Sequence, residues 1–136
     1  MNKNLIKTDF KGVYLVKKNI FYDNRGHFFE LFNTKEFRKY FKTNFVQDNI
    51  SYSVKGTLRG LHFQKNNKQV KLLTVLKGSI FDVLVDLKKR HKKNWISFEI
   101  DEDSQYSLLI PNSYAHGFYA KKNSIVHYKV SSYTSQ

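Results

Sequence analysis

Short runs in which apolar and polar residues alternate, separated by polar turns, recur along almost the whole chain. Runs of this kind, bounded by Asn, Asp, Gly, Ser or Lys, are typical of β-strands. Many short strands with regular turns predict an all-β fold, an antiparallel sandwich or barrel. About ten strands are predicted, at 13–16, 27–32, 45–51, 54–64, 69–77, 79–87, 95–100, 106–110, 115–120 and 125–130.

One short helix is predicted between the second and third of these strands. Asn33 and Thr34 supply the cap, and the helix is expected to run from Lys35 to Phe41 with its aromatic residues on one face. No linker, repeat or low-complexity segment interrupts the pattern, so residues 1–136 are expected to form one domain.

Two turns predict β-hairpins. Gly78 separates the strands at 69–77 and 79–87, and Lys121-Lys-Asn-Ser124 separates the last two strands. In the second hairpin, a three-residue loop would place His116 directly opposite Tyr128, whereas a four-residue loop would separate them.

Within the strand at 79–87, alternation puts Asp82 and Asp86 on the same face as Leu84. The alternate residues Phe81, Val83, Val85 and Leu87 share the other face.

The formal net charge of +13 favours anionic partners: nucleic acid, an anionic membrane surface or a phosphate-bearing small molecule. The basic residues are spread along the chain apart from the run Lys88-Lys-Arg-His-Lys-Lys93, which we interpret as a solvated loop because strand-like runs flank it. Cysteine is absent, which excludes disulfides and thiolate metal sites. No apolar run approaches the ~18 residues of a membrane span, and no signal peptide is visible, so a soluble cytoplasmic protein is expected.

The strongest chemical signal is Lys55-Gly-Thr-Leu-Arg-Gly-Leu-His-Phe-Gln64. Arg59 carries a permanent fork of donors suited to phosphate or carboxylate, and His62 can exchange a proton near neutral pH. Residues three apart in a regular strand point to opposite faces, but Gly60 between them is typical of a bulge, which could turn both to one side. The alternative interpretation is an ordinary strand with an exposed arginine and a core histidine.

This segment is one of six blocks that follow one another in a recognisable order. They are 23–32, 47–51, 55–64, 69–71, 78–86 and 110–118, within a match from about Tyr22 to Tyr133. Together they resemble the dTDP-4-dehydrorhamnose 3,5-epimerase family. The resemblance implies a cupin-type jelly roll, usually dimeric, so that residues 1–136 would be a single cupin-like domain and the protein a homodimer.

The resemblance also implies an isomerase that needs no cofactor and acts on a dTDP-linked 4-keto-6-deoxy sugar, in deoxysugar and lipopolysaccharide or capsule biosynthesis. A proton is removed beside the ketone and returned to the opposite face. His62 matches the family's base, Lys71 a lysine near the developing enolate, and Tyr128 the tyrosine acid. Tyr133 fits less closely, because Thr134 follows where the family often has a second tyrosine. Positions implied to hold the nucleotide, phosphates or sugar are Arg25, Glu30, Gln47, Asn49, Arg59, His116 and Tyr133, and the early blocks reach the partner subunit's site.

A metal-binding cupin is not expected, because the first metal motif needs His-x-His and a later glutamate, whereas His62-Phe-Gln64 offers one histidine. His116 would be the second histidine, and no carboxylate joins the two. His27, His91 and His127 have no motif role.

The family also supplies an aspartate from a C-terminal region beyond Gln136, and that aspartate orients the base. We hypothesise that Asp82 or Asp86 substitutes for it. Three alternatives remain open: a sugar 3,4-ketoisomerase, a non-catalytic nucleotide-sugar-binding cupin, and an RNA-binding protein that stacks bases on its aromatic residues. The Arg-Gly-Leu-His-Phe-Gln segment favours the epimerase, and neither a nucleic acid nor a membrane is expected as a partner.

Overall fold

A computed structural model describes residues 4–65 and 68–134. Within these residues the chain forms twelve β-strands and one short helix, α1 (Thr34–Phe37). The strands are β1 (Leu5–Lys7), β2 (Tyr14–Lys17), β3 (Ile20–Asp23), β4 (Gly26–Phe29), β5 (Gln47–Ser53), β6 (Leu58–His62), β7 (Lys71–Lys77), β8 (Ser79–Asp86), β9 (Trp95–Asp101), β10 (Tyr106–Ile110), β11 (Tyr114–Ala120) and β12 (Ser124–Val130).

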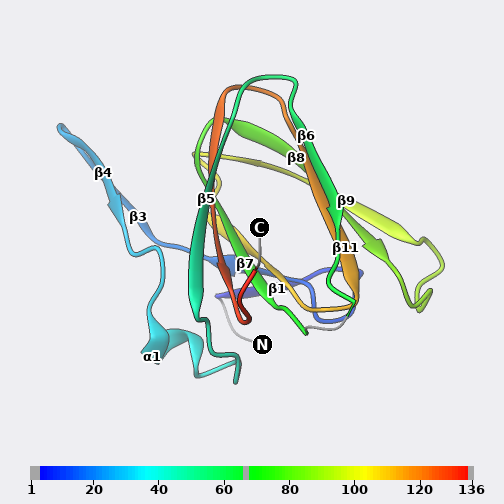
Figure 1. The fold of residues 1–136 in the computed structure, drawn as a ribbon. Helices are drawn as coiled ribbons and strands as arrows, with labels where there is room; N and C mark the ends of the chain where they lie inside the picture. The colour runs from blue at the N-terminus through cyan, green and yellow to red at the C-terminus, as the bar shows by residue number, and fades with distance from the viewer. Residues whose placement is uncertain (1–3, 66–67, 135–136) are drawn as a thin grey trace.

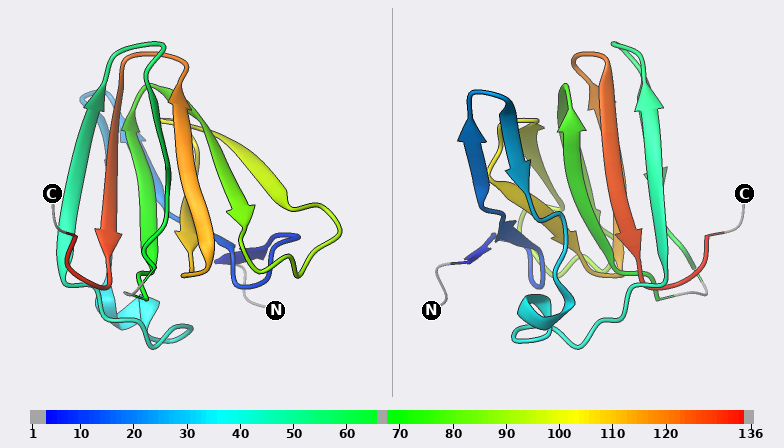
Figure 2. Two further views of the ribbon diagram at one scale, coloured as in Figure 1. Left: turned by 45° about the vertical axis from the view of Figure 1, so that its right-hand side comes forward. Right: turned by 90° about the vertical axis from the view of Figure 1, so that its left-hand side faces the viewer.

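Two antiparallel sheets face each other and form the body of the molecule (Figures 1 and 2). One sheet has the strand order β1-β2-β10-β7-β12-β5, and the other has the order β6-β11-β8-β9. Strands β3 and β4 pair only with each other, and this hairpin projects from the body (Figure 1). The predicted all-β sandwich with one short helix is therefore confirmed.

The hydrophobic core lies between the two sheets, as strand alternation predicts. Leu73 and Val126 from the six-stranded sheet meet Ile80 and Leu84 from the four-stranded sheet, and all four are fully buried. Removal of such apolar side chains from water is the main favourable term in folding. On β8 the buried face that carries Leu84 also carries Asp82 and Asp86, so two carboxylates enter the interior with the apolar residues.

Both predicted hairpins are wrong in their pairing. Strand β7 pairs with β10 and β12, whereas β8 pairs with β9 and β11, so the turn at Gly78 carries the chain from one sheet to the other. The turn at 121–123 does the same between β11 and β12. A short turn fixes the reversal of chain direction but not whether the two strands share a ladder. His116 and Tyr128 consequently lie on facing sheets instead of on neighbouring strands.

The predicted helix begins as expected and ends earlier. Asn33 caps it, because its Oδ1 accepts a hydrogen bond from the backbone N–H of Glu36 at 3.1 Å. The helix ends at Phe37 instead of Phe41, although the ring of Phe41 still packs against that of Phe37 at a centroid distance of 4.9 Å. No helix in the described residues is long and apolar enough to cross a membrane.

Candidate functional site

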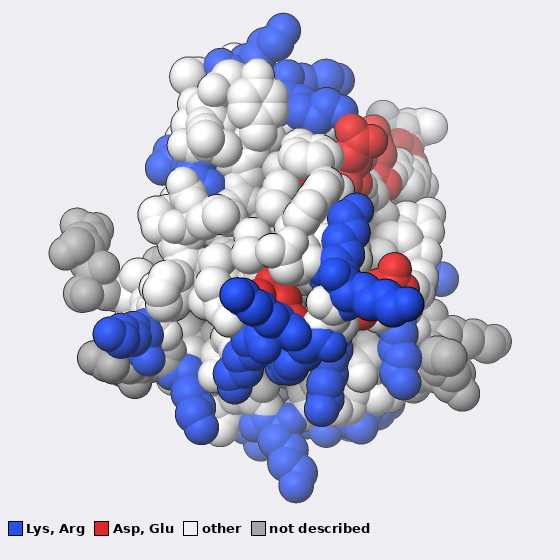
Figure 3. Space-filling view, turned by 90° about the vertical axis from the view of Figure 1, so that its right-hand side faces the viewer, with Lys and Arg blue, Asp and Glu red and all other residues white. Residues whose placement is uncertain are grey.

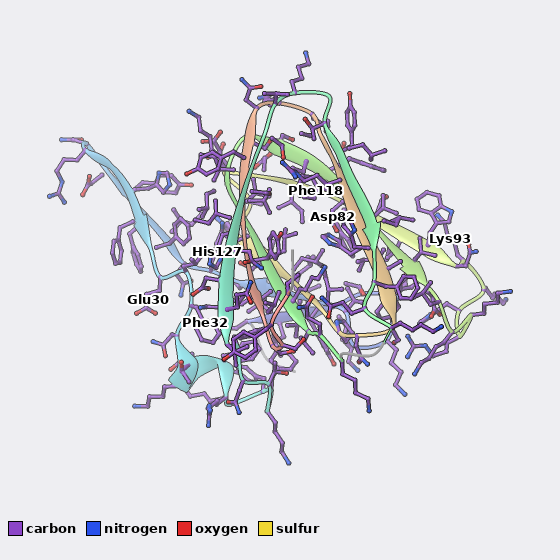
Figure 4. The ribbon with its side chains drawn as sticks, viewed as in Figure 1. Glu30, Phe32, Asp82, Lys93, Phe118 and His127 are labelled. Carbon is purple, nitrogen blue, oxygen red and sulfur yellow. The ribbon has the colours of Figure 1, made fainter. Side chains whose placement is uncertain are left out.

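A cavity of about 380 Å³ lies at one end of the sandwich and is lined by residues of both sheets. Its walls carry His62 from β6 and His116 from β11, and Lys71 from β7 and Tyr128 from β12. These are the predicted base, lysine and acid together with one predicted sugar-binding residue. The strands they come from face each other across the sandwich (Figure 4).

Strand alternation explains why Lys71 and Tyr128 point inwards. Leu73, a core residue, lies directly opposite Tyr128 in the ladder between β7 and β12, and Lys71 is two residues from Leu73. All three side chains therefore share the inner face of the six-stranded sheet. Lys71 is the first residue of β7, so the inner face changes there from apolar to polar at the end of the core.

A β-bulge at Gly60 sets the position of His62. His62 lies opposite His116 and Arg59 lies opposite Phe118, so three residues along β6 match two along β11. Gly60 has a φ of +100°, and a Cβ added there would lie 2.6 Å from the carbonyl oxygen of His116. Only glycine fits this close approach, and the predicted bulge is present.

The bulge does not bring Arg59 to the same wall as His62. The Nε of Arg59 donates a hydrogen bond to Oγ of Ser53 at 2.8 Å, and its NH2 group donates to the carbonyl of Tyr52 at 2.9 Å. Arg59 is therefore tied to the end of β5 and does not line the cavity. The expectation that the bulge turns both side chains to one side is therefore wrong. His62 lines the cavity, and Arg59 does not.

Asp82 and His116 form a buried pair behind the cavity wall. The Nε2 of His116 lies 2.6 Å from Oδ1 of Asp82, whose side chain is fully buried. Oδ2 of Asp82 is also buried and has no hydrogen-bond partner among the described residues. Burial raises the pKa of Asp82, an effect that His116 and Lys71 oppose, and burial lowers the pKa of Lys71, an effect that Asp82 opposes.

The hypothesis that Asp82 or Asp86 orients His62 is wrong. Asp82 bonds to His116, and Asp86 accepts hydrogen bonds from His91 and from backbone N–H groups of the following loop. Within residues 4–65 and 68–134, no hydrogen bond to the His62 ring is formed, and His62 is exposed at the cavity wall.

Gln47 and Asn49 lie beside the cavity without lining it. Asn49 is directly opposite Tyr128, and the Nε2 of Gln47 donates to Oδ1 of Asn49 at 2.8 Å. Oε1 of Gln47 accepts a hydrogen bond from the backbone N–H of Thr134 at 3.2 Å, and Thr134 is part of the cavity wall. The side chain of Tyr133 is exposed and does not line the cavity.

Arg25 and Glu30 lie away from the cavity that His62 lines. Arg25 is at the tip of the β3–β4 hairpin, where its exposed guanidinium pairs with Asp23 at 2.7 Å. Glu30 lines a second cavity of about 370 Å³, between the hairpin, α1 and the outer face of the six-stranded sheet. Neither residue reaches the His62 cavity of its own chain.

Two residues have roles that sequence reasoning did not assign. Asp82 holds His116, a partner that alternation along β8 could not indicate. Gln69 donates from Nε2 to the carbonyl of Ser132 and to Oγ1 of Thr134, both at 2.9 Å, and so fixes the segment after β12 against the cavity. Alternation along β8 placed Asp82 on one face with Leu84, but only the strand order identifies its partner.

Metal ligands are not gathered in the described part of the chain. No three His, Cys, Asp or Glu side chains there come close enough together to hold a metal ion. His116 of the cavity is held by a single carboxylate, that of Asp82.

Comparison with known proteins decides the family. The family model described as dTDP-4-dehydrorhamnose 3,5-epimerase matches residues 7–136. The chain belongs to this family. The dTDP-4-dehydrorhamnose 3,5-epimerase of Methanothermobacter thermautotrophicus is 41% identical over 128 residues, which cover 91% of this chain and 69% of that protein. A Shigella flexneri relative of the same name is also 41% identical, over 85% of this chain and 66% of its own length, so the chain spans about two thirds of these relatives.

Solved structures agree with this assignment. The dTDP-6-deoxy-D-glucose-3,5-epimerase of Legionella pneumophila, in complex with dTDP-4-keto-L-rhamnose, superposes with a TM-score of 0.89 at 35% identity, covering 97% of this chain and 73% of that one. The dTDP-4-dehydrorhamnose 3,5-epimerase of Bacillus anthracis, with TDP and PPi bound, gives 0.87 at 43% identity, covering 96% and 78%. The predicted family and cupin-type jelly-roll fold are confirmed.

Proposed function

We propose that this domain binds a dTDP-linked 4-keto-6-deoxyhexose in the His62 cavity and epimerises it at C3, with or without C5. His62 removes the proton beside the ketone, and Tyr128 returns a proton to the opposite face of the sugar. The observation that carries this proposal is the position of the two groups. His62 and Tyr128 belong to facing sheets and line one cavity, which is the arrangement that inversion at a carbon requires.

The enolate formed in this step needs positive charge or hydrogen-bond donors near its oxygen. Lys71 lines the same cavity as His62, and its Nζ is partly desolvated, so its interaction with an oxyanion is stronger than in water. His116 lies directly opposite His62 and is held by Asp82, which fixes the orientation of its ring toward a bound sugar.

The proposal includes a homodimer in which the β3–β4 hairpin of each chain contributes to the cavity of the other. Arg25 and Glu30 lie away from the cavity of their own chain, on or next to a hairpin that projects from the body (Figure 1). The hairpin exposes Phe21 and Phe28, each with roughly two thirds of its surface accessible, and exposed apolar side chains of this size are typical of an interface. A location in the cytoplasm, expected from the sequence, remains part of the proposal.

The decisive experiment is incubation of the protein with dTDP-4-keto-6-deoxyglucose in heavy water, followed by NMR. Deuterium at C3 alone, or at C3 and C5, with the ketone still at C4 is the expected result. A ketone that has moved to C3 would identify a 3,4-ketoisomerase and contradict the proposal. Binding of the sugar nucleotide without any exchange would identify a non-catalytic binding protein.

Two variants assign the groups. The His62→Asn variant is expected to lose exchange at both carbons, because no other group takes the first proton. The Tyr128→Phe variant is expected to keep deuterium exchange while losing inversion, because the proton then returns only from the face of the base. His127→Asn, a change of the same kind on the outer face of the six-stranded sheet and outside the cavity, is the control for His62→Asn.

A further inference from the structure

Positive charge is concentrated around the mouth of the His62 cavity. The segments 63–65, 68–70 and 87–94 lie at this end of the sandwich, and Phe63, Gln64, Gln69 and Leu87 belong to the cavity wall. By sequence, the first two segments contribute two lysines and the third contributes five cations, with no Asp or Glu among them. The seven residues are Lys65, Lys68, Lys88, Lys89, Arg90, Lys92 and Lys93.

The opposite end of the sandwich is nearly balanced in charge. Its turns carry Lys55, Lys77, Lys121 and Lys122, but also Asp101, Glu102 and Asp103. The excess of positive charge therefore lies at the cavity end. Figure 3 shows Lys and Arg side chains gathered over the lower part of the face on which β8 and β9 lie.

The loop that follows β8 is held in a fixed shape beside the cavity. Asp86 accepts hydrogen bonds from the backbone N–H groups of Lys88 at 3.1 Å and Arg90 at 2.7 Å, and its Oδ2 lies 2.6 Å from Nδ1 of His91. The NH2 group of Arg90 also donates to Oγ of Ser113, a residue of the cavity wall, at 3.2 Å. These contacts hold the backbone of the loop beside the cavity wall, whereas the side chain of Lys93 lies over the ring of Trp95 on the edge strand β9 (Figure 4).

The lysines of these three segments are not neutralised by nearby carboxylates. In the described residues, Arg90 is the only one of the seven cations with an ion pair, to Asp86, and all seven side chains belong to exposed residues. Uncompensated charge of one sign beside a cleft attracts an oppositely charged ligand over a distance of about a Debye length, ~8 Å at physiological salt.

We propose that these three basic segments act as an electrostatic funnel that accelerates association of a nucleoside-diphosphate ligand with the cavity. This inference rests on the proposed function for the identity of the ligand. The funnel acts on the approach of the diphosphate, not on the bound complex, because its cations are exposed and none of them lines the cavity. It assigns a use to a basic loop that the sequence alone identifies only as solvated.

The test is stopped-flow association of a fluorescent N-methylanthraniloyl derivative of dTDP at about 20 mM and about 500 mM salt. The triple variant Lys88→Gln, Lys89→Gln, Lys92→Gln is compared with Lys55→Gln, Lys77→Gln, Lys122→Gln, which removes the same charge at the opposite end. We expect the first variant to lower the association rate constant about tenfold at low salt, and the control to lower it less than about twofold. Association of the corresponding thymidine derivative, which lacks the diphosphate, is expected to stay unchanged in both variants.

Three outcomes would overturn the funnel. They are equal effects of the two triple variants, an effect of the loop variant that persists at high salt, and an effect confined to the dissociation rate, which would indicate direct contact in the complex. Absence of dTDP binding to the wild type would also overturn it. Deuterium exchange separates the two proposals: exchange without a specific effect of the loop variant removes only the funnel, and salt-dependent association without exchange removes only the epimerase.

Discussion

His116 and Asp82 are joined by a 2.6 Å hydrogen bond that crosses between neighbouring strands of the four-stranded sheet. His116 faces the cavity, whereas Asp82 is buried behind it. The charge of Lys71 lowers the pKa of Asp82, and the charge of Asp82 raises the pKa of Lys71, in each case against the effect of burial. A single carboxylate therefore holds one cavity residue in place and balances the charge of another. His62, which lies opposite His116 on β6, has no such partner among the described residues.

The Asp82→Asn variant is expected to lower kcat/KM by about 10- to 100-fold, since a hydrogen bond to a charged group contributes about 1.5–3 kcal/mol. The loss should fall mainly on kcat, because Asp82 lies behind the cavity wall and does not line the cavity. Steady-state kinetics with the dTDP-sugar measure the effect. Asp48→Asn is the control, because Asp48 also bonds a histidine, His127, at 3.0 Å but on the outer face of the other sheet. Equal losses in the two variants would contradict a role for Asp82 at the cavity.

Gly60→Ala is expected to destabilise the fold and to displace His62. The new Cβ would meet the carbonyl of His116 at 2.6 Å, so β6 must move away from β11. A displacement of about 1 Å typically costs about 100-fold in rate. Gly56→Ala is the matched control, because Gly56 also has a positive φ, +91°, but has no atom within 4 Å of the added Cβ. Thermal unfolding and kcat are measured for both, and activity equal to that of Gly56→Ala would show that the close approach does not position His62.

Asp86→Asn is expected to lower the free energy of unfolding at neutral pH by about 3 kcal/mol, because His91 and the backbone N–H groups of Lys88 and Arg90 lose the charged acceptor that the buried Asp86 provides. Desolvation opposes ionisation of Asp86, but hydrogen bonds from His91 and the backbone of Arg90 and Lys88 outweigh it and lower its pKa to about 2. A pKa lowered by folding contributes stability above the unfolded value of 3.8, and that stability is lost as the pH falls toward 2. Urea unfolding across this range should show the wild type and variant converging in acid.

The exposed Asp103→Asn variant is the control for this pH dependence and is expected to change stability by less than about 0.5 kcal/mol. A gap between wild type and Asp86→Asn that stays constant down to pH 2 would show that the charge of Asp86 is not the source of the effect.

Mixing two inactive variants tests whether each cavity uses residues of both subunits. Arg25→Ala and His62→Asn are each expected to lose most activity when prepared alone. After unfolding and refolding together, half of the dimers contain one chain of each kind, and one of their two cavities has both residues intact. About a quarter of wild-type activity should return, because random exchange in a symmetric dimer leaves that share of cavities complete. No recovery, with mixed dimers demonstrated by mass spectrometry, would place both residues in one chain's site.

The sequence by itself determined the features that depend on local chemistry. Alternation predicted which residues of β8 share a face, Asn33 identified the start of α1, and Gly60 indicated the bulge, because each follows from the backbone of a few adjacent residues. Alternation did not predict that the face with Asp82 and Asp86 is the buried one. The motif blocks also brought out four residues that line one cavity: His62, Lys71, His116 and Tyr128.

Only the tertiary structure decided which elements meet. The turns at Gly78 and 121–123 reverse the chain equally well within one sheet or between two, and packing of the whole core selects the second. That choice puts His116 and Tyr128 on facing walls and brings Asp82 under His116 instead of His62. Arg59 is likewise adjacent to His62 in sequence, but its hydrogen bonds to Ser53 and Tyr52 hold it at β5. Side-chain partners across strands depend on strand order, and strand order is set by burial between distant segments of the chain.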